Sequence, residues 1–185
     1  MTLLADNVRV GITGELFVAP LGTTRPTSSN SMLDPAYVGL GYVSEDGVTE
    51  AHEDSVENLI AWQNATIVRA VRSESVMTLA CTLIETKGEL LELFHPGSEI
   101  EVVSAGQWKL EVPTPTVDRR QFVLNVVDGS KILRIDVGNG EVTSRGEITY
   151  ASSDVIGYQI TITCYPDSDG NLCVKYSNDA AWGYS

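Results

Sequence analysis

The chain has 185 residues, a length that fits one domain able to bury a full hydrophobic core. Its 12 basic and 25 acidic residues give a net charge of −13, which argues against a protein that reads nucleic-acid sequence, because phosphate affinity comes from Lys and Arg. The same charge is compatible with a surface that DNA passes without binding, and also with an acidity that serves only solubility.

Residues 7–19 read as a strand or bent strand, and an unusual loop follows them. This loop, residues 20–36, is rich in Pro, Thr, Ser and Asn, which are typical of turns and flexible connections. We therefore expect a flexible loop beside a strongly negative surface. No Lys or Arg occurs between Arg25 and Arg69, whereas acidic residues are frequent there: Asp34, Glu45, Asp46, Glu50, Glu53, Asp54 and Glu57.

The spacing of apolar residues predicts four short strands in the next segment. Residues 37–44 and 48–51 flank Glu45-Asp46-Gly47, and Asp-Gly between short apolar runs is typical of a tight hairpin turn. Residues 66–72 and 75–84 read as two further strands, and neither face of the second carries a charge. We therefore expect that second strand to be covered on both faces.

One short helix of roughly ten residues is predicted after these strands. Thr86 and Glu89 have the spacing of a capping box, in which each side chain satisfies an orphan backbone donor. His95-Pro96-Gly97 ends the segment. A helix this short is marginal alone, so its apolar side must dock on a sheet. The residues that recur at helical spacing are Leu90, Leu93 and Phe94.

The second half of the chain returns to strands. Gly138-Asn139-Gly140 reads as a tight turn, and residues 166–185 are polar and turn-rich. Many short strands separated by turns predict a mainly β fold, a sandwich or barrel with one short flanking helix. We expect one domain, 1–185, with candidate arms at 1–12 and 166–185. The strand patterns span residues 100–103, 108–112, 120–127, 133–137, 148–150 and 158–164.

Cysteines and tryptophans show no pattern typical of a site. Cys81 and Cys164 each lie in an alternating strand pattern, so we expect small buried apolar residues there. The three cysteines are an odd number without metal-type spacing, and the N-terminus does not resemble a signal peptide. No apolar stretch approaches the roughly 20 residues of a membrane span. A reduced protein folded in the cytosol is expected, with Trp62, Trp108 and Trp182 in the core or at an interface.

Motifs for catalysis or metal binding are weak. Adjacent carboxylates such as Glu53 and Asp54 point to opposite faces of a strand, so they do not converge as a glycosidase pair would. His52 lies among carboxylates and could be a weak metal ligand, but is more often a solvated histidine. Residues 167–171 match part of a calcium loop, but Gly170 comes too early and a β-turn explains them better. We expect no catalytic, cofactor or metal site.

A series of motifs in fixed order resembles the major tail proteins, or tail tube proteins, of long-tailed (siphovirus-type) bacteriophages. Residues 14–23, Gly-Glu-Leu-Phe-Val-Ala-Pro-Leu-Gly-Thr, lead into the loop, and 39–48 follow as Gly-Leu-Gly-Tyr-Val-Ser-Glu-Asp-Gly-Val. Ala-Trp-Gln at 61–63, Val-Arg at 68–69 and Thr-Leu-Ile-Glu-Thr at 82–86 complete the series. The resemblance covers roughly residues 8–96 well, and the later segment only in general character.

The resemblance implies a structural virion protein and its partners. Such subunits form a β-sandwich with a flanking helix, and six assemble into a ring around a shared inner barrel. Rings stack into a tube around a tape-measure protein, and DNA later passes an acidic lumen without specific binding. Tail terminator and baseplate proteins would cap the tube. Folding and assembly would take place in the host cytoplasm, without a membrane or a cofactor.

Two candidate surfaces follow from this picture, and two other functions stay open. The alternatives are another tail ring component, such as a terminator or baseplate protein, and a small-ligand or carbohydrate-binding β-barrel with one apolar pocket. The acidic candidates for the lumen or for ring stacking are Glu45, Asp46, Glu50, Glu53 and Asp54. The candidate inter-ring loop comprises Thr23, Thr24, Arg25, Pro26, Thr27, Ser28, Ser29, Asn30, Ser31, Met32, Leu33 and Asp34.

Overall fold

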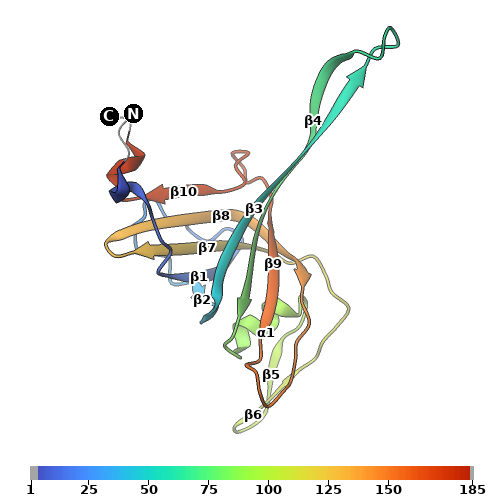
Figure 1. The fold of residues 1–185 in the computed structure, drawn as a ribbon. Helices are drawn as coiled ribbons and strands as arrows, with labels where there is room; N and C mark the ends of the chain where they lie inside the picture. Colours follow the sequence, from blue (N-terminus) through green and yellow to red (C-terminus); the bar gives the residue numbers. More distant parts are fainter. Residues whose placement is uncertain (1–3, 184–185) are drawn as a thin grey trace.

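A computed structural model describes residues 4–183, apart from the side chains of residues 6, 72 and 73, and within this range eight strands form one antiparallel sheet. The sheet order is β2-β1-β7-β8-β9-β4-β3, and β10 pairs with β8 beside this path. The predicted mainly β fold with one short helix is confirmed (Figure 1). The strands are β1 Thr13–Pro20, β2 Val38–Gly39, β3 Val43–Ile60, β4 Ile67–Leu83, β5 Ile100–Ser104, β6 Gln107–Leu110, β7 Arg119–Asp128, β8 Lys131–Arg145, β9 Tyr158–Cys164 and β10 Val174–Ser177.

The sheet folds into two layers because β8 takes part in both. The first half of β8 pairs with β7, and its second half, from Gly140, pairs with β9. Figure 1 shows β7 and β8 crossing β4 and β9 at a steep angle. The tight turn predicted at 138–140 is therefore wrong. These glycines lie inside the strand, where a Cβ on Gly140 would stand 2.8 Å from the ring of Phe122. Residues 148–150, predicted as strand, are coil.

The hydrophobic core lies between the two layers. Phe122, Leu124 and Val137 face it from one layer, and Met77, Leu79 and Ile160 face it from the other. Alternation along β9 is complete, with Tyr158, Ile160, Ile162 and Cys164 buried, as the sequence predicted. Cys81 and Cys164 are also buried, and burial raises the pKa of each thiol to about 12.

The helix α1, Gly88–Phe94, closes one end of the core with Leu90, Leu93 and Phe94, as predicted. The capping box is wrong, because the N-cap is Lys87 and no side chain caps the helix. Thr86 is instead 3.1 Å from the hydroxyl of Tyr158, whose ring packs edge-on against Phe94. The remaining helical turns, Ala5–Asn7 and Ala180–Trp182, are short 3-10 segments. None of the helices within residues 4–183 is long and apolar enough to cross a membrane.

Strands β3 and β4 form one long hairpin, so the predicted hairpin at 45–47 is wrong. The ladder passes from Val43 opposite Leu83 to Val48 opposite Cys81, and residues 44–47 bulge out between these pairs. Asp46-Gly47 is therefore part of a β-bulge, in which Gly47 has a φ of 70°. The real turn follows Ala61, and Asn64 and Ala65 adopt positive φ there. The strands predicted at 66–72 and 75–84 are one continuous strand.

The far half of this hairpin has no other strand beside it. Strand β9 pairs only with Met77–Leu83 of β4, so the hairpin beyond Met77 pairs only with itself. Figure 1 shows it projecting from the body of the molecule. The two candidate arms meet on the other side. Arg9 contacts Asp179 at 2.5 Å, and β10 of the C-terminal arm is part of the sheet. Residues 1–3 and 184–185 of these arms lie outside the described residues.

The predicted loop at 20–36 lies against the outer face of β7 and β8, held by two arginines. Arg134 donates from Nη1 to the carbonyl oxygens of Ser28 (2.9 Å) and Ser31 (2.7 Å). Arg25, from the loop itself, donates to Asp136 on β8 (2.8 Å) and to Asp167 (2.6 Å). The loop is therefore fixed to its own sheet by charge-assisted hydrogen bonds.

Asp136 makes this attachment sensitive to the loss of Arg25. Its side chain is fully buried, and burial raises its pKa although Arg25 acts in the opposite direction. Burial, and then the negative charge of Asp136, raises the pKa of the nearby Tyr37 to about 12. Hydrogen bonding to Arg25 lowers the pKa of Asp167. Arg25 thus compensates the negative charge of the Asp136 carboxylate, which is buried away from water.

Replacing Arg25 by Ala should lower the free energy of unfolding by roughly 3 kcal/mol, because a buried carboxylate loses its cation. Amide exchange in residues 23–34 should also become faster, which hydrogen-exchange mass spectrometry measures. Lys109→Ala is the control: it breaks an exposed ion pair and should change stability little. Arg25→Ala combined with Asp136→Asn should recover part of the loss. Equal losses in the single and double variants would contradict this role.

Candidate assembly surfaces

The acidic candidates on β3 do not form one cluster. From Val48 to Ser55 the β3–β4 ladder is regular, so successive side chains alternate between the faces of the sheet. Glu50 lies opposite Leu79, a core residue, and therefore on the inner face. Glu53 lies opposite Val76 and therefore on the outer face. The structure thus separates residues that the sequence grouped together.

Glu50 is neutralised inside its own chain. Lys175 of β10 contacts both of its carboxylate oxygens, at 2.6 and 2.8 Å, and His52 contacts it at 2.6 Å. Burial acts to raise the pKa of Glu50, but these two partners outweigh it and the pKa is lowered. Glu50 therefore holds the C-terminal strand β10 against the base of the hairpin.

Glu45, Asp46 and Glu53 are exposed, and none of them pairs with a cation among the described side chains. Glu45 and Asp46 belong to the β3 bulge, which carries their charges away from the ladder. Glu53 lies where the hairpin leaves the body, beside the outer faces of β4 and β9. That outer face carries half-buried hydroxyl side chains, namely Thr78, Thr82, Thr161 and Thr163.

Sequence reasoning missed an apolar surface at the end of the hairpin, which we call the hairpin tip, residues 58–71. Its one ionisable side chain in the sequence is that of Arg69. The ladder is regular from Val56, just before the tip, to Leu59, so these two side chains point to opposite faces of the hairpin, and each is more than half exposed. Ile60 is more than half exposed as well. The side chain of Trp62 is 96% exposed. An unbroken uncharged run from 58 to 68 was the sequence signal for this surface.

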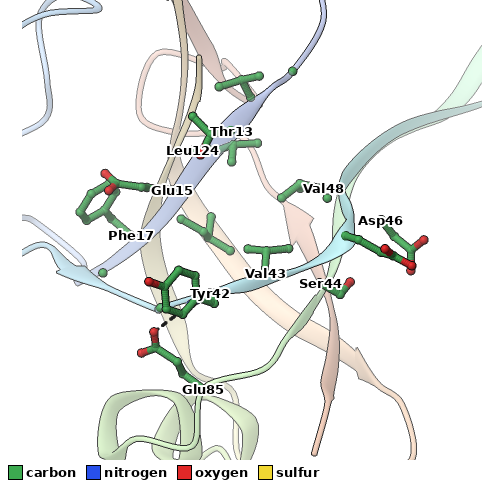
Figure 2. A pocket seen from close by; sticks show the side chains of 18 of the residues that line it. Thr13, Glu15, Phe17, Tyr42, Val43, Ser44, Asp46, Val48, Glu85 and Leu124 are labelled. Carbon is green, nitrogen blue, oxygen red and sulfur yellow. Dashed lines mark hydrogen bonds between the residues drawn. The ribbon is translucent and has the colours of Figure 1, made fainter. Parts of the chain in front are cut away.

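A second surface is an open groove between β1 and β3, which we call the seam. Its volume is 890 Å³. Val43, Val48 and Val126 line it and pack at the same time against the core, so the seam exposes the flank of the core. Figure 2 shows β1 and β3 on its two sides, with Glu85 at one end accepting a hydrogen bond from the amide of Tyr42 at 3.3 Å. Its carboxylates are Glu15, Glu45, Asp46 and Glu85.

The seam is open because the sheet does not close into a barrel. On this side β1 pairs with β2 only at Phe17 and Val18, and β3 pairs only with β4. Glycines also keep it wide. Gly14 lies so close to β7 that a Cβ would stand 2.6 Å from the carbonyl oxygen of Asn125, so no side chain can fill the seam from there.

The remaining candidates from the sequence are the turn at 167–171 and the three tryptophans. Among the described side chains, no three of His, Cys, Asp or Glu are grouped so that they could hold a metal ion. Asp167 accepts hydrogen bonds from the amides of Asp169 and Asn171, which makes residues 167–171 the predicted turn. Trp108 and Trp182 are exposed like Trp62, so none of the three tryptophans is a core residue.

Comparison with known proteins gives the family. The phage tail tube protein family matches residues 1–184. One similar solved structure is from the sheath-tube complex of an extracellular contractile injection system, with TM-score 0.51 and 8% identity, covering 94% of each chain. Another is from the sheath/tube terminator of such a system, with TM-score 0.49 and 10% identity, covering 93% of this chain and 99% of that chain. No curated protein matches the sequence.

The first of these structures is similar in fold alone, because its sequence identity is so low. The family match is of a different kind, because it extends over nearly the whole chain. It agrees with a protein that displays exposed apolar and acidic surfaces on an antiparallel sheet. This chain therefore belongs to the phage tail tube protein family: it is a structural, non-enzymatic component of the virion that forms the tail tube.

Proposed function

We propose that six copies of this chain close into a ring, and that rings stack into the tube of a long-tailed, siphovirus-type phage with an anionic bore. The siphovirus type and the number six are what the resemblance of residues 14–86 to such tail tube proteins implies. The exposed hairpin tip supports association between copies. The tape-measure protein would occupy the bore during assembly in the host cytoplasm, and terminator and baseplate proteins would cover the end rings.

The hairpin tip is the observation that carries this proposal. A two-stranded hairpin in water is marginally stable, and this one shows apolar side chains on both faces. Apolar area gains about 25 cal/mol per Å² when it leaves water, so such a tip favours burial against other chains. A single partner surface would cover one face of the hairpin and leave the apolar side chains of the other face exposed to water. The tip therefore fits a position between neighbours, which a stacked tube supplies.

The seam argues against the alternative of a small-ligand barrel. Ligand pockets enclose most of their ligand's surface and place a few polar groups inside. The seam instead runs along two strand edges and is bordered by carboxylates. Unpaired strand edges are typical sites of association with another chain.

We assign the acidic residues to two roles. Glu53 is the bore candidate, because it is exposed on the outer face next to the hydroxyl-rich surface of β4 and β9. A bore with carboxylates and hydroxyl groups repels phosphate and lets DNA slide. Glu45 and Asp46 are stacking candidates, because the bulge carries them to the rim of the seam. Asp54 lies on the opposite face from Glu53, which is the inner face that also carries Glu50.

The loop at 23–34 is our candidate for contact between rings. Arg134 and Arg25 hold it in one conformation, so it can present a defined surface without first ordering itself. Met32, at 94% exposure, is the apolar side chain that it displays. An exposed Met is suited to such a contact because its flexible side chain adapts to a partner surface.

Ile60→Ser combined with Trp62→Ser should leave the fold intact and prevent tube formation. The physical reason is the loss of apolar area that only a neighbour buries. Negative-stain microscopy and sedimentation velocity would measure assembly, and circular dichroism would check the fold. Val155→Ser, which changes an exposed apolar residue elsewhere, is the control. Tubes of normal length from the double variant would refute a role of the tip in assembly.

Glu53→Lys should permit tube assembly and slow DNA release by about tenfold, because phosphate contacts with cations dominate DNA affinity. The measurement is the rate of genome ejection from phage that carry the variant, at two salt concentrations. The slowing should weaken at higher salt, where phosphate contacts are screened. Glu147→Lys adds the same charge at another exposed position and serves as control. Unchanged ejection at low salt would remove Glu53 from the bore.

Met32→Asp should weaken stacking while single rings still form, because a charge would replace an apolar contact between rings. Cryo-electron microscopy of the purified variant would count rings against tubes. Val155→Asp is the matched control on a different surface. If the Met32 variant makes tubes as long as the control does, the loop does not lie between rings.

A further inference from the structure

We propose that the hairpin tip of one copy seats in the seam of another copy. This inference rests on the proposed function, because it names the two surfaces that join neighbouring subunits. The contact is heterologous: each copy offers a tip to one neighbour and a seam to another, so the contact repeats from copy to copy.

Apolar complementarity is the first reason. The seam exposes Val43, Val48 and Val126, which already belong to the edge of the core. A side chain inserted there continues the core of the host subunit. The tip supplies side chains of this kind, since Leu59, Ile60 and Trp62 are all exposed. Each surface is unfinished alone and gains burial from the other.

Charge is the second reason. Arg69 is the single ionisable residue of the tip. The rim of the seam carries Glu15, Glu45 and Asp46, and within the described chain none of these pairs with a cation. Lys87 also lines the seam, but its ammonium donates to the carbonyl oxygen of Gly39. The rim is therefore anionic where a tip would bring a guanidinium.

Strand edges are the third reason. Residues 13–15 of β1 and residues 43–48 of β3 border the seam without a further strand partner in residues 4–183. The tip also has free edges on both of its strands. Pairing one edge of the tip with one edge of the seam satisfies backbone groups on both copies, as in strand addition to a sheet edge.

The β5–β6 hairpin is the competing docking surface. It exposes Val102 and Trp108, which would also cover an apolar tip. However, its carboxylates Glu101 and Glu111 both contact Lys109 at 2.9 Å, so no free acid remains in this hairpin for Arg69. It is a projecting hairpin of two strands rather than a groove. The observations therefore favour the seam.

Disulfide trapping tests this contact directly. Ile60→Cys places a thiol on the tip, and Thr13→Cys places one in the seam, in a Cys173→Ser background. The remaining native thiols, Cys81 and Cys164, are buried with a pKa of about 12 and do not react readily. Oxidised tubes of the double variant should give a ladder of covalent multimers on a denaturing gel. Mixed single variants should give covalent dimers only.

The control pairs Ile60→Cys with Val102→Cys on the β5–β6 hairpin. A ladder from this control and none from the seam variant, in tubes of normal form, would overturn the seam assignment and leave the proposed function standing. If the wild-type chain forms neither rings nor tubes with its virion partners, the proposed function itself fails. The two failures are thus distinguishable.

Charge reversal gives a second test that needs no crosslink. Arg69→Glu, and separately Glu45→Lys with Asp46→Lys, should each raise the concentration needed for assembly by about tenfold or more. Combining all three changes should restore most of the loss, whereas Arg69→Lys should behave like the wild type. Asp154→Lys is the control for added charge. Additive losses in the combined variant would overturn the proposal.

Discussion

The fold depends on how one antiparallel sheet covers its own core. The sheet closes on one side through β8, which bends at Gly138 and Gly140 and pairs with β7 and then with β9. It does not close on the other side, where β1 and β3 end in free edges around the seam. A barrel has no edges, whereas an open sandwich keeps two that can recruit another chain. The same open side leaves strand edges of the monomer unpaired and, in our proposal, is where a second copy binds.

The hairpin divides into two halves for a related reason. From Met77 to Leu83, β4 lies between β3 and β9, and its odd-numbered residues are buried in the core. Before Met77, β9 is absent and the two strands have only each other. Their apolar side chains then lack a layer to pack against, so burial must come from outside the chain. The net charge of −13 opposes non-specific association, because monomers repel one another over the Debye length of about 8 Å at physiological salt.

The sequence predicted most strands and the helix because each of these elements buries one regular face, and that face leaves a regular spacing of apolar residues in the sequence. Strand β9 and the Leu90–Phe94 side of α1 are examples, since each buries one regular face. Glycine and turn residues misled the prediction where tertiary structure uses them differently. Asp46-Gly47 serves a bulge, and Gly138 and Gly140 admit Arg25 and Phe122. The real hairpin turn contains Asn64-Ala65, which lacks the glycine of a typical turn signal.

The candidate surfaces were harder to predict than the fold, because they depend on which face a residue occupies. Glu50 and Glu53 look equivalent in the sequence, yet one binds Lys175 on the inner face and the other is exposed on the outer face. The seam joins residues more than 100 positions apart, such as Thr13 and Val126. No local sequence pattern predicts that residues so far apart in the chain lie side by side. The hairpin tip is different, because its long uncharged run is visible in the sequence and marks a surface that water does not favour. This exposed run is the reason for our proposal that the tip is buried on a partner, and in a tube of identical subunits the nearest partner is another copy of the same chain.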